Sequence, residues 1–134
     1  MPLNGTVVAI GSDRDIVTAR QYGRELALSL GLSLGEATLI ATAISELARN
    51  IVSYARTGEV VLSVSETPNR VGLTVVARDA GPGIPDVELA LRNGFSTSGS
   101  FGVGLPGVRR LMDDFDIRST PGDGTVVTVT KWRS

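Results

Sequence analysis

The sequence predicts an α+β fold, a two-layer sandwich in which helices cover one face of a mixed, mostly antiparallel sheet. Two observations lead to this class. Stretches with apolar residues at helical spacing alternate with short runs rich in β-branched residues. Pairs of those runs are separated only by turn residues, which is typical of antiparallel hairpins. The length of 134 residues predicts a single domain, residues 1–134.

The first half of the chain predicts one strand, at residues 6–10, followed by two helices. Ser12 with Asp15 three residues later resembles a helix start, and apolar residues then recur at helical spacing. Residues 33–36 (SLGE) form a capping box that opens the second helix. We expect this second helix to run to about Arg56 and to end before Gly58.

The second half predicts two pairs of strands with a helix between them. The runs 59–66 and 70–78 are strand-like and are joined by turn residues, so an antiparallel hairpin is expected. Pro106 suits the first turn of a helix that is expected to reach about Phe115. Two last strands are expected at residues 116–120 and 125–132, around a Pro-Gly-Asp-Gly turn.

Composition excludes several kinds of chemistry. The chain has no cysteine and no histidine, which removes disulfides, thiolate or histidine metal sites and a Ser-His-Asp triad. Its net charge is −1 and it has no long basic run, so the charge gives no reason to expect nucleic acid or a membrane as partner. No apolar run approaches the roughly 18 residues of a membrane span. We expect a cytoplasmic protein.

Glu46 and Asn50 are the first candidate functional residues. Their spacing of four puts both side chains on one helix face, one turn apart. The apolar stripe of this helix lies roughly opposite, so both side chains are expected to point away from the main core contact. The stripe comprises Ala37, Ile40, Ala41, Ile44, Ala48, Ile51 and Ala55. Asn50 can hold a cation and Glu46 can take a proton, but alone such a pair is more often a solvated helix face.

Asp79 stands at the end of a predicted strand, where its carboxylate can accept a hydrogen bond from an amino group such as that of adenine. Gly81 and Gly83 would let a ligand ring approach the backbone closely. For this segment alone, a β-turn capped by an aspartate is the simpler interpretation.

A second glycine-rich segment, residues 93–104, precedes the third predicted helix. Free amides and the helix dipole at a helix start form an anion site suited to phosphates. Gly99, Gly102 and Gly104 would let several of these amides converge on one oxygen, and Ser98 could add a hydroxyl donor. For this segment alone, a flexible loop with polar residues is the simpler interpretation.

Taken together and in order, these motifs resemble those of the GHKL superfamily of ATPases, which groups gyrase, HSP90, histidine kinases and MutL and has the Bergerat ATP-binding fold. The matching motifs are Glu46-x-x-x-Asn50, Asp79-x-Gly81-x-Gly83, Gly102-x-Gly104 before a helix, and Gly124-Thr125 in a strand turn. Within the superfamily, five phrases resemble the small switch serine kinases of bacterial stressosomes, the RsbT-like family. The phrases are ISELARNI (44–51), DAGPGIPD (79–86), GFSTSG (94–99), GLPGV (104–108) and KW (131–132).

The resemblance implies a role for each matched residue. Asn50 would coordinate a Mg²⁺ ion that bridges the phosphates of ATP, and Glu46 would accept the proton of the attacking hydroxyl. Asp79 would bind the adenine amino group with support from the Thr125 hydroxyl. Residues 93–104 would form a lid over the phosphates. The remaining nucleotide-binding candidates are Gly81, Gly83, Ser98, Gly99, Gly102, Val103 and Gly104.

The resemblance also implies an activity and partners. The family phosphorylates serine or threonine on STAS-domain scaffold proteins and is then released to a PP2C-type phosphatase regulator, which leads to sigma-factor release. We therefore predict an ATP-dependent protein serine/threonine kinase. Two alternatives are a nucleotide-gated binding module, such as an anti-sigma factor, and a pure ATPase. Glu46 favours the kinase over the binding module, which has no need of a carboxylate beside the metal ligand.

Overall fold

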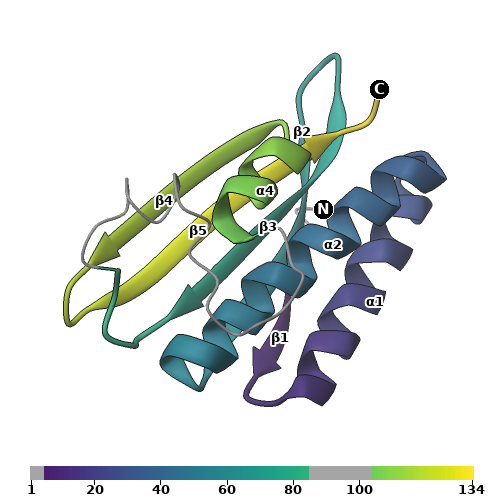
Figure 1. Ribbon diagram of the computed structural model, residues 1–134. Coiled ribbons are helices and arrows are strands. Elements are labelled where there is room, and N and C mark those ends of the chain that lie inside the picture. Colours follow the sequence, from purple (N-terminus) through teal and green to yellow (C-terminus); the bar gives the residue numbers. More distant parts are fainter. Residues whose placement is uncertain (1–4, 85–103) are drawn as a thin grey trace.

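The computed structural model describes residues 5–84 and 104–134. Within them, helices α1, α2 and α4 lie on one face of a five-stranded sheet (Figure 1), so the predicted two-layer α+β class is confirmed. The elements are β1 (Thr6–Ile10), α1 (Asp13–Ser29), α2 (Leu34–Asn50), η1 (Ile51–Ala55), β2 (Gly58–Glu66), β3 (Val71–Asp79), α4 (Gly104–Leu111), β4 (Asp114–Thr120) and β5 (Gly124–Trp132).

The strand order in the sheet is β1-β2-β3-β5-β4. All four pairings of the described strands are antiparallel, where the sequence predicts a mixed sheet. The reason lies in the connections: β2 follows β1 after the hairpin of α1 and α2, and the other two neighbouring pairs along the chain are joined by tight turns. The last strand, β5, lies between β3 and β4, which brings the two halves of the chain together (Figure 1).

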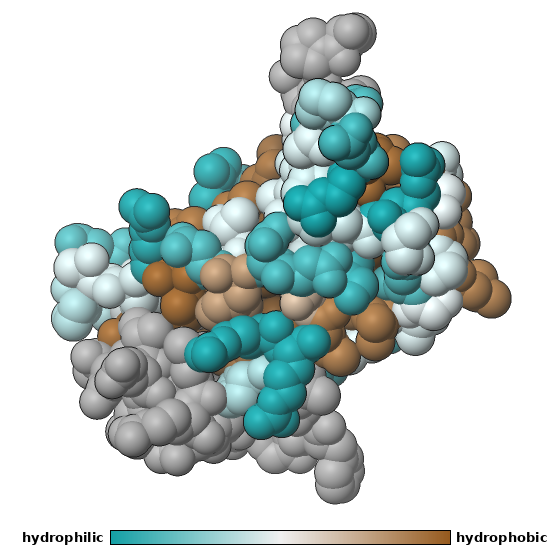
Figure 2. All heavy atoms as spheres, turned by 90° about the horizontal axis from the view of Figure 1, so that it is seen from above, coloured by the Kyte–Doolittle hydropathy of each residue, from teal (hydrophilic) through white to brown (hydrophobic). Residues whose placement is uncertain are grey.

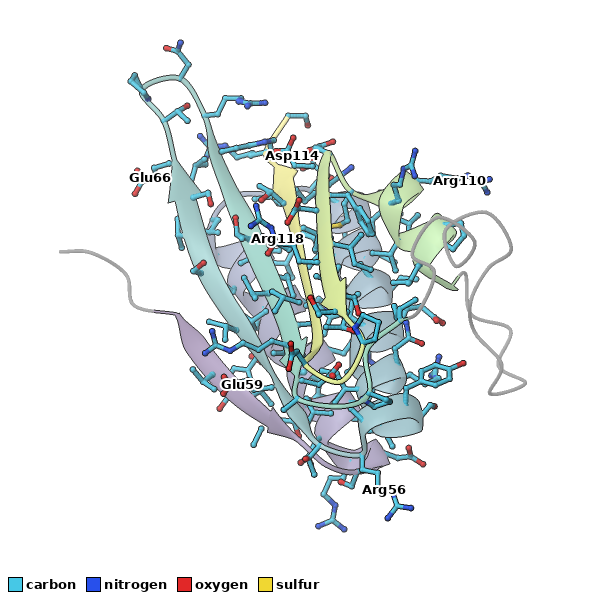
Figure 3. All side chains as sticks on the ribbon, turned by 90° about the vertical axis from the view of Figure 1, so that its left-hand side faces the viewer. Arg56, Glu59, Glu66, Arg110, Asp114 and Arg118 are labelled. Carbon is cyan, nitrogen blue, oxygen red and sulfur yellow. The ribbon has the colours of Figure 1, made fainter. Side chains whose placement is uncertain are left out.

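The core forms between the sheet and the helices. Strand residues alternate between the two faces, and the inner positions are apolar and buried. They include Val60, Leu62, Leu73, Val75, Val127 and Val129, which face Ile40, Ile44, Leu47 and Val108 of the helices. The side view in Figure 3 shows the two layers, with Glu59, Asp114 and Arg118 on the sheet and Arg110 on α4.

The capping box of α2 is confirmed in full. The Ser33 hydroxyl accepts from the Glu36 N–H at 3.0 Å, and Glu36 Oε1 accepts from the Ser33 N–H at 2.8 Å. The second oxygen, Oε2, accepts from the N–H of Ser134 at 3.1 Å, so the end of the chain is fastened to the start of this helix. The start of α1 is as predicted, with Ser12 as the N-cap residue. The Ser12 side chain makes no capping bond, and Asp15 accepts from the Gly11 N–H at 2.9 Å.

One predicted boundary is confirmed and another is wrong. The second helix runs to about Arg56, as predicted: α2 continues directly into the π-helix η1, and Arg56, with φ 71°, is the C-cap. Helix α4 ends at Leu111 rather than near Phe115, which lies in β4. The cause is Asp113, whose N–H donates to the Thr130 carbonyl at 2.9 Å and draws the chain into the sheet.

Exposed apolar side chains are scattered over the surface. The most exposed are Leu34, Val7 and Tyr22, whose exposed fractions are 63%, 54% and 51%. They lie in three different elements, α2, β1 and α1. Figure 2 shows hydrophilic and hydrophobic residues interspersed on one face of the molecule. Such single exposures are normal for a folded domain. Among the described helices, none combines the length and apolar character that crossing a membrane requires.

We predict that Glu36→Gln makes folding stability less dependent on pH in the acidic range. The hydrogen bond from the Ser33 backbone lowers the pKa of Glu36 below its ordinary value of 4.5. Its stabilising contribution is therefore present above pH 4.5 and is lost as the pH falls through the lower, folded-state pKa. Urea unfolding should show a loss of about 0.3–1 kcal/mol in the variant at pH 7, and less at pH 3.

The control is Glu66→Gln, which removes an exposed carboxylate at the end of β2. A stability difference between the wild-type chain and Glu36→Gln that stays constant from pH 7 to pH 3 would contradict the prediction.

Candidate functional site

Helix α2 contacts α1, α4 and the strands β2, β3 and β5. Its buried surface is therefore wider than the predicted stripe and includes Ala43, Glu46 and Leu47. Glu46 is only 2% exposed, so the expectation that its side chain lies on the outer face of the helix is wrong. The sequence predicts the face that meets the sheet, but the packing of two more helices against α2 depends on distant segments.

The two carboxylate oxygens of Glu46 have different surroundings. Oε1 accepts from Arg49 Nη1 at 3.0 Å, one turn further along α2. Oε2 is buried and has no hydrogen-bond partner among the described residues. A buried carboxylate oxygen without a donor costs stability, so this oxygen is an unusual feature of the helix.

Asn50 lies at the wall of a pocket, one helical turn beyond Glu46. The π-helix η1 follows directly and turns Ile51 and Tyr54 into the same pocket. A π turn widens the helix locally and is frequent at functional sites. Asn50 and Glu46 therefore lie close to the pocket on one helix, although Glu46 is not among the described residues that line it.

Asp79 and Thr125 are brought together by the sheet. They are paired in the register of β3 and β5, and both line the pocket. Asp79 Oδ1 accepts from the Gly81 N–H at 2.9 Å, so the turn predicted for this aspartate is present. The structure thus brings Asn50, Asp79 and Thr125 to a single pocket, as the sequence predicts.

Ser119 is a residue that the sequence analysis missed. Its hydroxyl accepts from the Ile84 N–H at 2.7 Å, donates to the Gly124 carbonyl at 3.2 Å and lies 2.8 Å from Thr125 Oγ1. It therefore fixes both Thr125 and the segment that lines the pocket after β3. One feature of the sequence could have identified Ser119: it lies on the other side of the last turn from Thr125, at the position that pairs with Thr125 in the register of β4 and β5.

Gly81 and Gly83 serve the packing of the chain, in addition to any ligand. A Cβ atom on Gly81 would lie 2.6 Å from the Cβ of Ala55 at the end of η1. Gly83 has φ +80°, and a Cβ there would overlap the Thr120 carbonyl. Only Gly83 of the two lines the pocket, so the sequence-based reason for Gly81 is incomplete: the close approach is that of η1.

The remaining pocket walls are apolar. They comprise Leu47, Ile51, Ala77, Pro82, Ile84, Leu105 and Val127, besides the Tyr54 ring. Asp79 is the one carboxylate among the described lining residues. The empty space in the pocket and at its mouth is about 580 Å³. A mainly apolar pocket with a few polar groups suits a flat, partly polar small molecule.

The phosphate-binding candidates are only partly described. Gly104 is the first residue of α4 and is buried, and Leu105 next to it lines the pocket. Ser98, Gly99, Gly102 and Val103, with the predicted lid up to residue 103, lie outside the described residues. Within the described ranges, no three His, Cys, Asp or Glu side chains gather to hold a metal. Asn50, the metal ligand that the resemblance implies, lines the pocket.

The chain is similar to known proteins along most of its length. Residues 35–133 match a family model described as histidine kinase-, DNA gyrase B-, and HSP90-like ATPase. The chain is 48% identical over 125 residues to the serine/threonine-protein kinase RsbT of Bacillus subtilis (strain 168), covering 93% of this chain and 94% of that protein. It is 32% identical to an anti-sigma F factor of Caldanaerobacter subterraneus subsp. tengcongensis, covering 85% and 82%.

Among solved structures, the mycobacterial sensor histidine kinase MprB has a similar fold. The TM-score is 0.53, the sequence identity is 18%, and the match covers 72% of each chain. At this identity, the likeness concerns the fold alone.

We predict that Ser119→Ala lowers the free energy of unfolding by about 1–2 kcal/mol, because the Ile84 N–H loses its acceptor in a partly buried position. Urea unfolding of the wild-type and variant proteins measures this difference. Ser63→Ala in β2, on the outer face of the sheet, is the matched control. Equal stability losses in both variants would argue against a special role for the Ser119 hydroxyl.

Proposed function

Because this chain belongs to the family of histidine kinase-, DNA gyrase B-, and HSP90-like ATPases and is a protein serine/threonine kinase, we propose that its substrates are STAS-domain proteins. The kinase phosphorylates a serine or threonine of the STAS domain with ATP. It is then released to bind and activate a PP2C-type phosphatase regulator, in a pathway that controls a sigma factor in the cytoplasm. The similarity to RsbT and to an anti-sigma F factor supports a role in sigma-factor regulation.

The observation that carries the proposed chemistry is the buried carboxylate of Glu46, one turn from Asn50. A group that takes a proton needs an oxygen that no protein donor occupies, and Oε2 of Glu46 meets this condition among the described residues. The neighbouring pocket offers Asp79 and Thr125 for the polar edge of adenine and apolar walls for its faces. The phosphates would then extend past Asn50 toward Glu46.

In the transfer, the acceptor hydroxyl oxygen forms a bond to the γ-phosphorus while the bond from the γ-phosphorus to the β–γ bridging oxygen breaks. ADP leaves with that oxygen, and the hydroxyl proton passes to Oε2 of Glu46 and later to water. Phosphoryl transfer depends on positioning and charge neutralisation more than on covalent help, so a buried, fixed base suits it.

The residues at the pocket also fit a Mg²⁺ ion. Mg²⁺ is usually held by one or two protein oxygens together with substrate phosphates and water, rather than by a cage of side chains. The Asn50 carboxamide, without a described cluster of acidic residues, corresponds to that donor set. When bound, the ion would neutralise phosphate charge, and Asn50 would hold it against the triphosphate.

A second candidate function is a nucleotide-gated binding module, in which ATP or ADP controls a protein contact and catalysis is incidental. The similarity to an anti-sigma F factor favours it. The two candidates differ in their need for Glu46: a binding module gains nothing from a buried carboxylate with an unpartnered oxygen, which costs stability.

We predict that Glu46→Gln binds ATP but transfers its γ-phosphate to a purified STAS-domain protein about 10²–10⁴ times more slowly than the wild-type chain. The amide keeps the size of the side chain but takes up no proton. Labelled ATP measures transfer, and a binding titration measures ATP affinity. Glu59→Gln, on the sheet, is the control. Full transfer by Glu46→Gln would refute the base assignment, and ATP binding without transfer by the wild-type chain would favour the binding module.

We predict that Asn50→Ala weakens ATP binding about ten- to a hundredfold in the presence of Mg²⁺, because the ion loses its protein ligand. Without Mg²⁺, the wild-type and variant affinities should converge. Titration calorimetry in both conditions measures the difference, with Asn69→Ala in the β2–β3 turn as the control. The same affinity in wild-type and Asn50→Ala protein with Mg²⁺ would exclude Asn50 as the metal ligand.

A further inference from the structure

The ion pair between Glu46 and Arg49 differs from the other ion pairs in the described part of the chain. The Glu46 side chain is 3% exposed, whereas the side chains of Arg118 and Asp116 in another pair are 83% and 58% exposed. Exposed pairs contribute little, because water solvates both charges. A buried carboxylate depends on its partner, because without it the charge would be left uncompensated.

Arg49 makes the two oxygens of this carboxylate inequivalent. Its Nη1 donates to Oε1 at 3.0 Å, while Oε2 has no partner among the described residues. A glutamate has several rotatable bonds, and the fixed Oε1 limits where Oε2 can lie. The Arg49 side chain is itself 35% exposed, so its guanidinium reaches inward from the surface to hold a buried group.

We propose that Arg49 is a positioning residue, which holds Oε1 of Glu46 so that Oε2 receives the proton of the acceptor hydroxyl. The inference rests on the proposed kinase function and deepens it. Arg49 lies three residues after Glu46 on α2, so the pair forms along one helix and needs neither nucleotide nor partner protein. The base is therefore in place before the substrate arrives, which lowers the entropic cost of the reactive geometry.

The guanidinium suits this task better than other side chains. It stays charged at every accessible pH, so it donates to Oε1 without competing for the transferred proton. The donors of the planar guanidinium have fixed directions, whereas a lysine ammonium is a compact charge on a flexible stem. Removal of Arg49 leaves the carboxylate present but free to turn, and the reaction slows without any loss of a group that touches the nucleotide.

The test compares Arg49→Met, Arg49→Lys and Arg118→Met in γ-phosphate transfer from labelled ATP to a purified STAS-domain protein. Met keeps an unbranched apolar stem but has no donor. We expect Arg49→Met to lower kcat about ten- to a hundredfold, with KM for ATP changed by no more than about twofold. Arg49→Lys should recover part of the loss, and Arg118→Met, from an exposed ion pair, should leave kcat unchanged.

A second measurement separates positioning from folding. Arg49→Met leaves a buried carboxylate without its partner, and this can lower the thermal midpoint of unfolding. The double variant Glu46→Gln/Arg49→Met removes the charge as well and should recover the midpoint. If Arg49→Met does not fold, the kinetic comparison is made with Arg49→Lys. We then expect this variant to have a lower kcat than the wild-type chain and an unchanged KM for ATP.

Several outcomes would overturn the positioning role of Arg49 without contradicting the proposed kinase function. They are an unchanged kcat in folded Arg49→Met, an unchanged kcat in Arg49→Lys where only that variant folds, or a loss that appears in KM for ATP as much as in kcat. If the wild-type chain transfers no phosphate to the STAS-domain protein, the proposed function fails, and the positioning role fails with it. The wild-type assay therefore distinguishes the two failures.

Discussion

The packing of α2 between α1, α4 and the sheet is the constraint on which the site depends. A helix held on three sides cannot rotate without disturbing the whole core, because protein interiors are packed as densely as crystals. The residues near its C-terminal end therefore have fixed directions. This packing buries Glu46 while Asn50, one turn later, still reaches the pocket. Glu46 is buried and Asn50 is accessible from the pocket because different segments cover these two positions of the same helix.

The other wall of the site comes from the far end of the chain. Pairing of β5 with β3 puts Thr125 beside Asp79, and the Ser119 hydroxyl fastens this pair to the segment after β3. The two walls meet where Gly81 packs against Ala55 at the end of the π-helix. A side chain at Gly81 would push η1 away from β3 and open the pocket between them.

Local signals in the sequence predicted the elements well. The capping box at Ser33 and Glu36, the β2–β3 hairpin and the alternation of the strands depend on residues close in sequence, and all are confirmed. The errors arose where distant segments decide the outcome. Asp113 ends α4 by bonding to Thr130, and Glu46 is buried because other helices cover α2. The roles implied for Asp79 and Asn50 came from the resemblance, and the structure adds that they share one pocket.

The carboxylates of Asp79 and Glu46 each accept a hydrogen bond at one oxygen, but from different kinds of donor. Asp79 commits one oxygen to the neutral amide of Gly81, and Glu46 commits one oxygen to the charged guanidinium of Arg49. The second oxygen of Glu46 has no partner among the described residues. In the proposed binding of adenine, the amino group only donates a hydrogen bond, so a neutral backbone donor is enough to orient Asp79. In the proposed transfer, Glu46 takes up a proton in a buried position, so it needs a partner that stabilises its charge beforehand, and the Arg49 guanidinium supplies it.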